Sequence, residues 1–393
     1  MTEARTALAG ALLLSIAAHV GTAGAAALTL GVLQRDGDER LDPKRVELAY
    51  LGHPGGSLAP AVELAARESQ FELDAAKLQV KVEVRSARSA DDAKAQLAAL
   101  AQAGAAAVVL DLPAAWIAGA AAGARIALIN AGSADEGPRQ QGCLPLLFHT
   151  LPGERMRADA LAQTLLARRW SRVLIVHGPS ADDATRLAVT QAAIKRYGLK
   201  PVATRPFKLS ADPRERELAN PLLLTGNAEY DVVWVVDSDG EFARSLPYRT
   251  ALPRPVVGDA GLAALAWAPG FERYGAPQLV RRFARAAQRP MTGPDWAAYM
   301  AGKAVLQAAL EQPAQPGPAQ IMAALTRADF TLDGFKGVRL SFRPWDRQLR
   351  QPLLLTDGVG VIGSAPVDGV MHPKNALDTL GADAPETACK VKA

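Results

Sequence analysis

Short apolar runs typical of β-strands alternate with amphipathic segments along most of the chain, and this alternation restricts the fold more than any other feature. A helix between two strands carries the chain back to the start of the sheet, so strands connected in this way run parallel. The first series of predicted strands covers residues 28–33, 79–85, 106–111 and 125–130, with a helix at 90–103. These elements predict one α/β unit.

A second α/β unit follows in the middle of the chain. Its predicted elements are helix 154–169, strand 172–177, helix 181–197, strand 200–208, helix 213–226 and strand 231–237. The last part of the chain contains predicted helices and then tail strands, at residues 276–288, 294–311, 319–327, 338–342, 352–356 and 359–362. Neither group can form a core alone, so each is expected to complete one of the two earlier units.

The predicted fold class is therefore α/β, with two doubly wound parallel-sheet lobes joined by a multi-segment hinge. The connections are expected near residues 150, 250 and 330. The predicted first lobe is 26–150 plus 256–328, the second is 151–255 plus 329–362, and 363–393 forms a tail held near the hinge. In open α/β sheets the ligand lies beyond the carboxyl ends of the strands, which places it between the lobes.

The N-terminal segment has the pattern of an export signal. Arg5 precedes an apolar stretch from Ala7 to Ala27, with small-residue cleavage patterns around Ala25, which is typical of a secretory signal peptide. We predict a signal peptide at 1–25 and a periplasmic protein. No later stretch approaches the roughly 18 uninterrupted apolar residues that a membrane span needs, so the mature chain is expected to be soluble.

Two cysteines, Cys143 and Cys389, would both reach an oxidising compartment on export. A single disulfide between them is the simplest pairing, and it would hold the C-terminal segment close to the first crossing between the lobes. The alternative is a pair of unrelated buried thiols.

The charge distribution and the local motifs argue against several other functions. The formal net charge is +4 and the basic residues are scattered, so no nucleic-acid-binding stripe exists. The G-x-G-x-x-G pattern at 358–363 lacks the following helix that would hold a pyrophosphate, so we predict a glycine-rich hairpin and no cofactor. A G-x-S-x-G-like segment at 178–182 fails at its last position, and Ser180 is better explained as a helix cap. We predict that the chain is not an enzyme.

Polar residues that follow the predicted strands are the candidates for ligand binding. Residues 53–57 place Ser57 and backbone N–H groups at a helix N-terminus, which suits an anion or a simple cap. Asp237 and Asp239 begin a cluster of oxygen donors, but Tyr248 stands where a calcium loop needs its bidentate Glu, so no metal is predicted. The complete set is His53, Ser57, Asp111, Asn130, Ser133, His177, Ser180, Asp237, Asp239, Asp259 and Trp267.

Several segments of the second half resemble one known family. They are Leu147-Phe-His-Thr-Leu-Pro152, Leu340-Ser-Phe-Arg-Pro-Trp345, Gln348-Leu-Arg-Gln-Pro352 and Leu377-Asp-Thr-Leu-Gly381. With the order of elements, they resemble the type I periplasmic binding proteins, of which the leucine/isoleucine/valine-binding protein is one. The more specific resemblance is to the ABC-transporter substrate-binding-like proteins of pyrroloquinoline-quinone-dependent alcohol dehydrogenase systems. The resemblance implies a small-molecule ligand of unknown identity, an ABC permease in the inner membrane, and a quinoprotein dehydrogenase or its cytochrome as a further candidate partner.

The resemblance also raises a question about the ligand. Amino-acid binders of this fold hold the ligand carboxylate with hydroxyl and N–H groups after two first-lobe strands, and its ammonium with a second-lobe acid. Here Asp111 starts the first such loop, Ser133 supplies a hydroxyl in the second, and Asp259 matches the acid. Because Asp111 would repel a carboxylate in a cleft of low dielectric constant, we expect a cationic or polyol-like ligand to fit no worse than an amino acid.

A competing hypothesis is an interaction protein that docks on the dehydrogenase without carrying a solute. A cleft filled by Trp116, Trp267 or Trp345 would favour this hypothesis, whereas an open polar cleft would favour transport.

Overall fold

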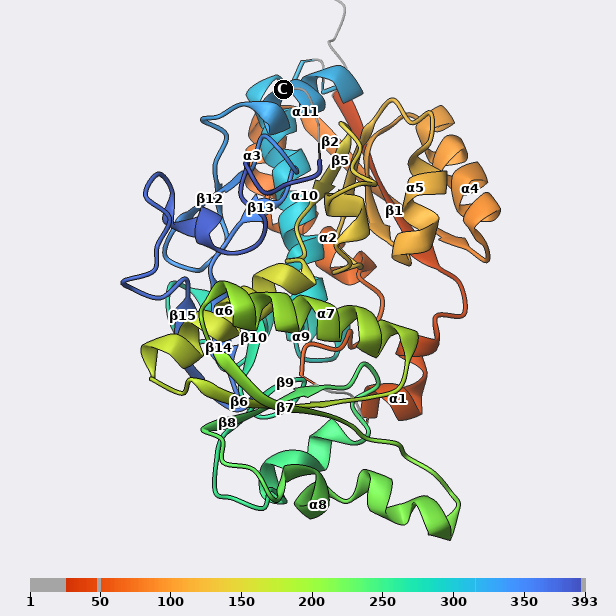
Figure 1. Ribbon diagram of the computed structural model, residues 1–393. Coiled ribbons are helices and arrows are strands. Elements are labelled where there is room, and N and C mark those ends of the chain that lie inside the picture. The colour runs from red at the N-terminus through yellow and green to blue at the C-terminus, as the bar shows by residue number, and fades with distance from the viewer. Residues whose placement is uncertain (1–25, 48–50, 315, 390–393) are drawn as a thin grey trace, which may run out of the picture.

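The computed structural model describes residues 26–47, 51–314 and 316–389, and it consists of two α/β lobes (Figure 1). The predicted signal peptide at 1–25 lies outside the described residues. The first lobe contains a five-stranded sheet in the order β2-β1-β3-β4-β5, in which every neighbouring pair is parallel. Its strands are β1 (Ala26–Arg35), β2 (Leu78–Ala87), β3 (Ala105–Asp111), β4 (Ala127–Asn130) and β5 (Leu147–His149). The structure thus confirms the predicted α/β class.

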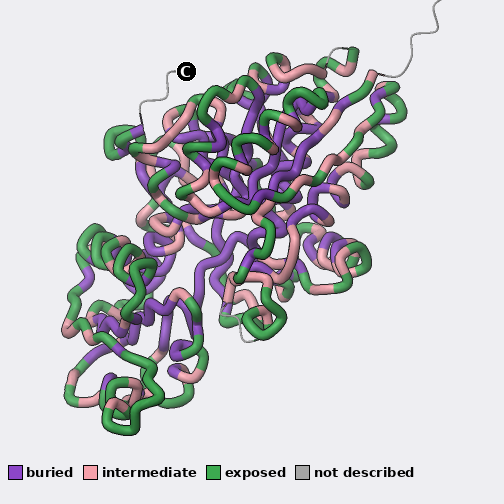
Figure 2. Tube along the Cα trace, turned by 90° about the vertical axis from the view of Figure 1, so that its right-hand side faces the viewer, coloured by how far each residue is buried: buried purple, intermediate pink, exposed green. Residues whose placement is uncertain are grey.

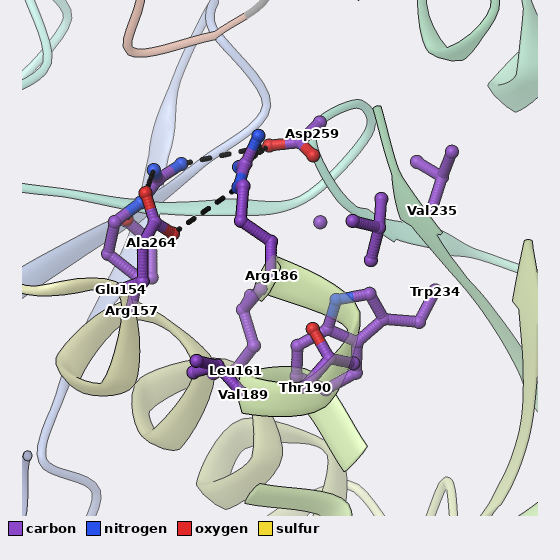
Figure 3. A pocket seen from close by; sticks show the side chains of 13 residues that line it. Glu154, Arg157, Leu161, Arg186, Val189, Thr190, Trp234, Val235, Asp259 and Ala264 are labelled. Carbon is purple, nitrogen blue, oxygen red and sulfur yellow. Dashed lines mark hydrogen bonds and ion pairs between the residues drawn. The ribbon is translucent and has the colours of Figure 1, made fainter. Parts of the chain in front are cut away.

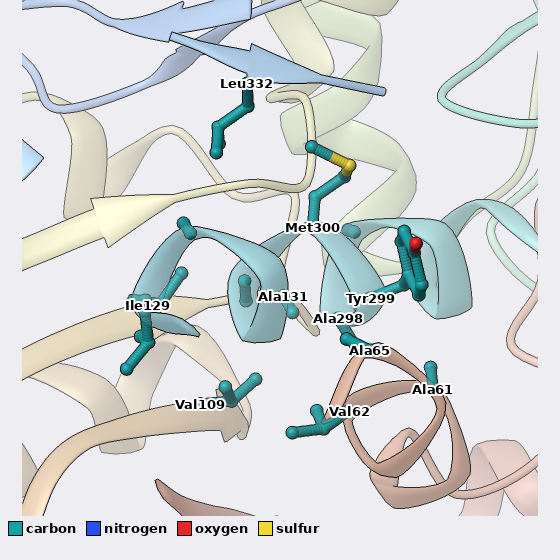
Figure 4. Packing of buried hydrophobic residues seen from close by; sticks show 14 of the residues in the cluster. Ala61, Val62, Ala65, Val109, Ile129, Ala131, Ala298, Tyr299, Met300 and Leu332 are labelled. Carbon is teal, nitrogen blue, oxygen red and sulfur yellow. The ribbon is translucent and has the colours of Figure 1, made fainter. Parts of the chain in front are cut away.

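Helices cover both faces of the first sheet, because alternate residues of a strand point to opposite sides. On β3, Val109 packs against α2 (Ala59–Glu68) and α10 (Gly293–Glu311), as Figure 4 shows. Its neighbours Val108 and Leu110 pack against α4 (Ala90–Gln102) and α5 (Ala114–Ala121). Small residues of α10 allow a close approach to α2: a Cβ at Gly302 would lie 3.2 Å from that of Ala65.

The second lobe contains a four-stranded parallel sheet in the order β7-β6-β8-β9. Its strands are β6 (Arg172–His177), β7 (Lys200–Pro206), β8 (Val232–Val236) and β9 (Val256–Gly258). The helices α6 (Glu154–Ala167) and α7 (Ala181–Arg196) pack on one face. The tube in Figure 2 shows buried residues gathered inside each lobe and exposed residues around them.

One predicted helix of the second lobe, residues 213–226, is wrong as a single element. The segment is a 3₁₀-helix at Pro213–Ala219 followed by the short helix α8 (Pro221–Thr225). Proline restricts the residue before it to extended conformations, and Asn220 is indeed extended, with its side chain accepting a hydrogen bond from the N–H of Leu222. Asn220 therefore ends the first element and caps the second.

The late helices α9 (Ala276–Ala287), α10 and α11 (Pro318–Thr326) pack into the first core. The chain returns to the second core at β14 (Leu353–Thr356), which pairs antiparallel with β10 (Ala263–Leu265) and β15 (Val361–Ala365). The predicted glycine-rich hairpin is confirmed as the β14–β15 turn, where Gly358 has φ +92°. The shorter elements are η1 (Glu39–Leu41), α1 (Pro43–Glu47), α3 (Gln70–Ala75), η2 (Gly137–Arg139), η4 (Ala243–Tyr248), β11 (Leu332–Asp333), β12 (Arg339–Phe342), β13 (Leu349–Arg350) and η5 (Ala376–Thr379).

The packing of the third chain segment suggests a different division between the lobes from the sequence-based one. Leu332, Leu340 and Leu349 pack in the first core, whereas Leu353 and Leu355 pack in the second. We propose that residues 256–265 belong to the second lobe, that residues 329–350 belong to the first, and that the last crossing lies near residue 351. The antiparallel strands β11, β12 and β13 form their own small sheet beside that crossing.

Buried hydrogen bonds join the first and last crossings between the lobes. The amide of Gln348 donates to the carbonyls of His149 (3.1 Å) and Leu151 (3.2 Å), and its Oε1 accepts from Arg139 Nε (2.8 Å). Gln351 donates to the carbonyl of Thr150 at 2.8 Å. These groups are buried, so the crossings form one packed hinge rather than separate flexible linkers.

The predicted disulfide is present in the structure. The Cα atoms of Cys143 and Cys389 lie 5.6 Å apart, and no described cysteine is free. The preceding tail binds α6 of the second lobe, where the N–H of Gly381 donates to Asp159 at 2.9 Å. The tail then reaches the first lobe, where the N–H of Ala388 donates to Gln140 at 3.0 Å.

Candidate ligand-binding cleft

The carboxyl ends of the two sheets hold most of the predicted site residues. Asp111 ends β3 and Asn130 ends β4, while His177 ends β6 and Asp237 follows β8. The two lobes also approach each other beside this edge: a Cβ at Gly52, in the loop after β1, would lie 2.7 Å from Leu265 and 3.9 Å from Arg157 of the second lobe. The position matches the place where open α/β sheets bind ligands.

Arg40, which no sequence pattern indicated, lies at the carboxyl end of the first sheet. Arg40 Nη2 lies 2.9 Å from Asp111 Oδ1, and Arg40 Nε lies 2.9 Å from Asp38 Oδ2. Its Nη1 donates to the carbonyl of Gly132 at 3.2 Å. Burial raises the pKa of Asp111, and the charge of Arg40 offsets this only in part.

Arg40 lies 71 positions from Asp111 in the sequence, so no local motif relates the two. It comes from the long connection between β1 and α2. The connection contains η1 and α1 among its described residues. Asp38 caps η1 by accepting a hydrogen bond from the N–H of Arg40.

The predicted residues His53 and Ser57 support this connection. His53 Nε2 lies 2.7 Å from the carbonyl oxygen of Arg40, and burial lowers the pKa of the imidazole, so a neutral ring that donates from Nε2 fits the contact. Ser57 donates to Gln34 at 2.7 Å and accepts from the N–H of Ala59 at the start of α2. Both side chains therefore position backbone segments of the first lobe.

Asn130 and Ser133 form the turn after β4. Asn130 Oδ1 accepts from the N–H of Ser133 at 2.9 Å, and its Nδ2 contacts the Ser133 carbonyl at 2.8 Å and His149 Nδ1 at 3.0 Å. The hydroxyl of Ser133 donates to Asp135 at 2.8 Å. With the bond from the N–H of Gly132 to Asn130 Oδ1 (3.3 Å), these contacts fix the turn that carries Gly132.

On the second-lobe side, Asp259 belongs to a ring of four charges, shown in Figure 3. Its carboxylate is paired with Arg186, and Arg157 Nη2 lies 3.9 Å away. Glu154 completes the ring, 3.0 Å from Arg157 and 3.6 Å from Arg186. Burial acts to raise the pKa of Glu154, but the two guanidinium charges outweigh it and lower the pKa.

The space behind this ring is lined by Leu161, Val189, Thr190 and Trp234 and measures about 30 Å³. That volume has room for a water molecule and is too small for an organic ligand. The space behind the ring is therefore not a pocket for an organic ligand.

The remaining second-lobe candidates differ in their roles. Ser180 and Asp183 form a complete capping box at the start of α7, which confirms the cap, and the Ser180 hydroxyl lies 3.0 Å from that of Ser238. His177 is half-buried with Nδ1 2.9 Å from the Gly178 carbonyl, and Asp239 is exposed. Asp237 is buried, and burial, together with the nearby carboxylates Asp239 and Asp259, raises its pKa to about 7 although the N–H of Ala243 opposes this.

The structure corrects the prediction for Trp267. It is 1% exposed and packs within the first core, stacked on Trp296 with ring centroids 6.2 Å apart. Burial of its large apolar ring favours a place in the core over a place at the cleft. Trp116 packs against the other first-lobe cluster, and Trp345 donates to the carbonyl of Ala382 at 3.1 Å, in the tail.

Comparisons with known proteins place the fold. No protein-family model matches the chain, and a search of the curated proteins also finds no match. Among solved structures, a branched chain amino acid ABC transporter periplasmic ligand-binding protein from Burkholderia xenovorans is 14% identical, with a TM-score of 0.71 over 93% of this chain and 99% of that one. An amino acid ABC transporter substrate-binding protein from Pseudomonas fluorescens is 13% identical, with a TM-score of 0.66 over 93% and 100%.

A third structure, an R. palustris ABC transporter solute-binding protein in complex with benzoate, is 14% identical, with a TM-score of 0.65 over 93% and 99%. These matches extend over nearly the whole chain, but at such identities they establish the fold alone. The chain has the two-lobed fold of the type I periplasmic binding proteins.

Within the part of the chain that the structure describes, no helix combines the length and apolar character that crossing a membrane requires. Nor do its His, Cys, Asp and Glu residues form a group that could hold a metal ion.

Proposed function

We propose that the protein is a periplasmic solute-binding protein that delivers a small ligand to an ABC permease. The observation that carries the proposal is the contact of the loop after β1 with Leu265 and Arg157 of the second lobe. Asp111 and Arg40 lie at the carboxyl end of the first sheet, and Asp237 and Asp259 lie at that of the second. A ligand that contacts both edges favours the closed arrangement of the lobes, because only that arrangement offers both sets of contacts.

The proposal includes export by cleavage of residues 1–25 and no catalytic activity. The capping role of Ser180 supports the second point, since its hydroxyl accepts the N–H of Asp183 at 2.9 Å. It also retains the finer hypothesis, based on the resemblance of the second half, that the ligand belongs to a quinoprotein alcohol oxidation system.

Native mass spectrometry of the protein purified from the periplasm of its own organism tests the proposal. We expect a retained adduct of small mass, and we expect that compound to compact the protein in small-angle scattering and to raise its melting temperature. If neither the adduct nor any alcohol-pathway metabolite, cofactor precursor or metal ion changes scattering or melting, the receptor function is wrong.

A second candidate function is an accessory protein of the dehydrogenase that transports no solute. It is favoured by the internal pairing of Asp111 with Arg40 and of Asp259 with Arg186. Co-purification of the dehydrogenase or its cytochrome with a tagged chain, together with an empty cleft in the native mass spectrum, is the result expected of this function.

A further inference from the structure

We propose that the carboxyl end of the first sheet is a guanidinium subsite, that Arg40 is its internal occupant, and that an external ligand with a guanidinium or amine group displaces it. The inference rests on the proposed function and names the class of ligand that the cleft takes. It is built on the contacts of Arg40 with Asp38, Asp111 and Gly132.

The place of the subsite is the first step of the argument. Its acceptors follow three strands that are neighbours in the sheet, since Asp38 follows β1, Asp111 ends β3 and Gly132 follows β4. Converging strand ends are where open α/β sheets bind their ligands. The guanidinium of Arg40 thus occupies a position where a ligand group is expected.

The chemistry of the subsite is selective for a cation. Among the described residues, the hydrogen-bond partners of the guanidinium are all acceptors: the Asp38 carboxylate, Asp111 Oδ1 and the Gly132 carbonyl. The two carboxylates carry two formal negative charges against the single charge of Arg40. A ligand carboxylate would face net repulsion, and Arg40 cannot bind it by two parallel hydrogen bonds without leaving Asp38 or Asp111.

The local backbone is built for this arrangement. A Cβ at position 132 would lie 2.7 Å from the Cα of Asp111, so only glycine allows the loop after β4 to approach β3 this closely. The approach brings the Gly132 carbonyl beside the Asp111 carboxylate, and both point at one guanidinium.

The exposure of the three side chains indicates which group can leave. The side chains of Asp38 and Asp111 are 3% and 4% exposed, whereas that of Arg40 is 34% exposed. The acids form the inner layer and belong to strand ends or the turn beside them, while Arg40 forms the outer layer. Displacement of Arg40 would expose an acidic recess already shaped for a planar cation.

The test compares the wild-type chain with R40A, R40A/D111N and R45A. Arg45 is an exposed residue of α1 in the same connection and serves as the matched control. The probes are methylguanidinium and agmatine, measured by calorimetric titration and thermal melting, with sodium chloride and benzoate at matched ionic strength. Circular dichroism establishes that each variant is folded.

We expect agmatine to bind the wild-type chain and to bind R40A at least about tenfold more tightly, because the internal competitor is gone. R45A should behave as the wild-type chain, and R40A/D111N should lose the gain. Failure of folded R40A to gain affinity, retention of the gain in R40A/D111N, or no binding to the wild-type chain would overturn the inference.

The outcomes separate this inference from the proposed function. If the wild-type chain binds a carboxylate ligand with compaction of the lobes, and R40A binds it less well, the receptor function stands and the guanidinium subsite is wrong. If R40A gains agmatine affinity but the protein never compacts with any solute, the subsite exists and the receptor function fails.

Discussion

At the scale of single residues, Asp237 differs from Asp111 and Asp259, which each pair with an arginine, because burial and the nearby carboxylates Asp239 and Asp259 raise its pKa. It is buried beneath the end of β8 with its backbone N–H bound to Asp259 at 2.8 Å, and its side chain accepts from the N–H of Ala243 at 2.7 Å. Its raised pKa therefore has a consequence for stability.

We expect Asp237 to make the protein less stable as the pH rises from about 4 to about 7. The unfolded carboxyl ionises near pH 4 and the folded one near pH 7, so the folded state binds more protons in this range and loses stability as they leave. Between pH 5 and 8, the free energy of unfolding of D237N should fall by about 2 kcal/mol less than that of the wild-type chain. Urea unfolding at several pH values measures the difference, with the exposed D91N as control; parallel pH profiles for D237N and the wild-type chain would contradict it.

Ser180 tests the distinction between a cap and a catalytic hydroxyl. S180A should lower the free energy of unfolding by about 1 kcal/mol, since the N–H of Asp183 loses its acceptor at the start of α7. S180D, which keeps an acceptor at the N-cap, should retain most of that stability in urea unfolding. Equal losses in both variants would show that the capping bond contributes little.

At the scale of elements, the hinge depends on a few buried polar side chains that link distant segments. Gln348 uses its amide oxygen and nitrogen at once, with partners in η2 and on either side of Thr150. Unlike a surface glutamine, it is 1% exposed. Its removal leaves several buried groups without a partner.

We expect Q348A to destabilise the protein by about 3 kcal/mol, because Arg139 Nε loses an acceptor and the His149 carbonyl loses a donor in a buried site. Q102A, at the exposed end of α4, is the control for an ordinary glutamine. Chemical unfolding followed by fluorescence measures both. If the free energy of unfolding of Q348A falls no more than that of Q102A, the hinge tolerates the loss of the Gln348 amide.

At the scale of the whole molecule, the C-terminal tail is a further connection between the lobes. It contacts α6 through the Asp159–Gly381 and Arg155–Glu386 pairs, and the disulfide then joins it to Cys143 of the first lobe. The crosslink spans 246 positions. Motion of the lobes about the hinge has to move this tail as well.

We expect C143S/C389S to be less stable by about 2 to 4 kcal/mol, because the unfolded chain regains the freedom that the crosslink removes. The interlobe distance, measured between spin labels at K94C on α4 and K195C on α7, should also show a broader distribution than in the chain that keeps Cys143 and Cys389. Identical distributions would mean that the other crossings alone limit the motion of the lobes. The parent chain treated with dithiothreitol, in which the disulfide is reduced, is the matched control for C143S/C389S.

The sequence by itself determined most of the longer elements and the fold class. Alternating apolar runs required parallel strands buried on both faces, so β3 and β8 could be placed from their composition. Export into an oxidising compartment also predicted the disulfide between Cys143 and Cys389. Short strands such as β5, which has three residues, were missed because so few residues carry no periodic signal.

Only the tertiary structure decided the partners of the polar residues. Asp111 and Asp259 were recognised from their place after strands, but Arg40 and Arg186 lie 71 and 73 positions away from them. Trp267 was predicted to be a site residue but lies in the core, because its burial depends on distant segments such as the helix that carries Trp296. The local sequence pattern locates the strand ends. The charged partner of each residue at a strand end comes from a segment that is distant in the sequence, so only the tertiary structure shows which charges lie together. Those pairs set the chemistry of the cleft.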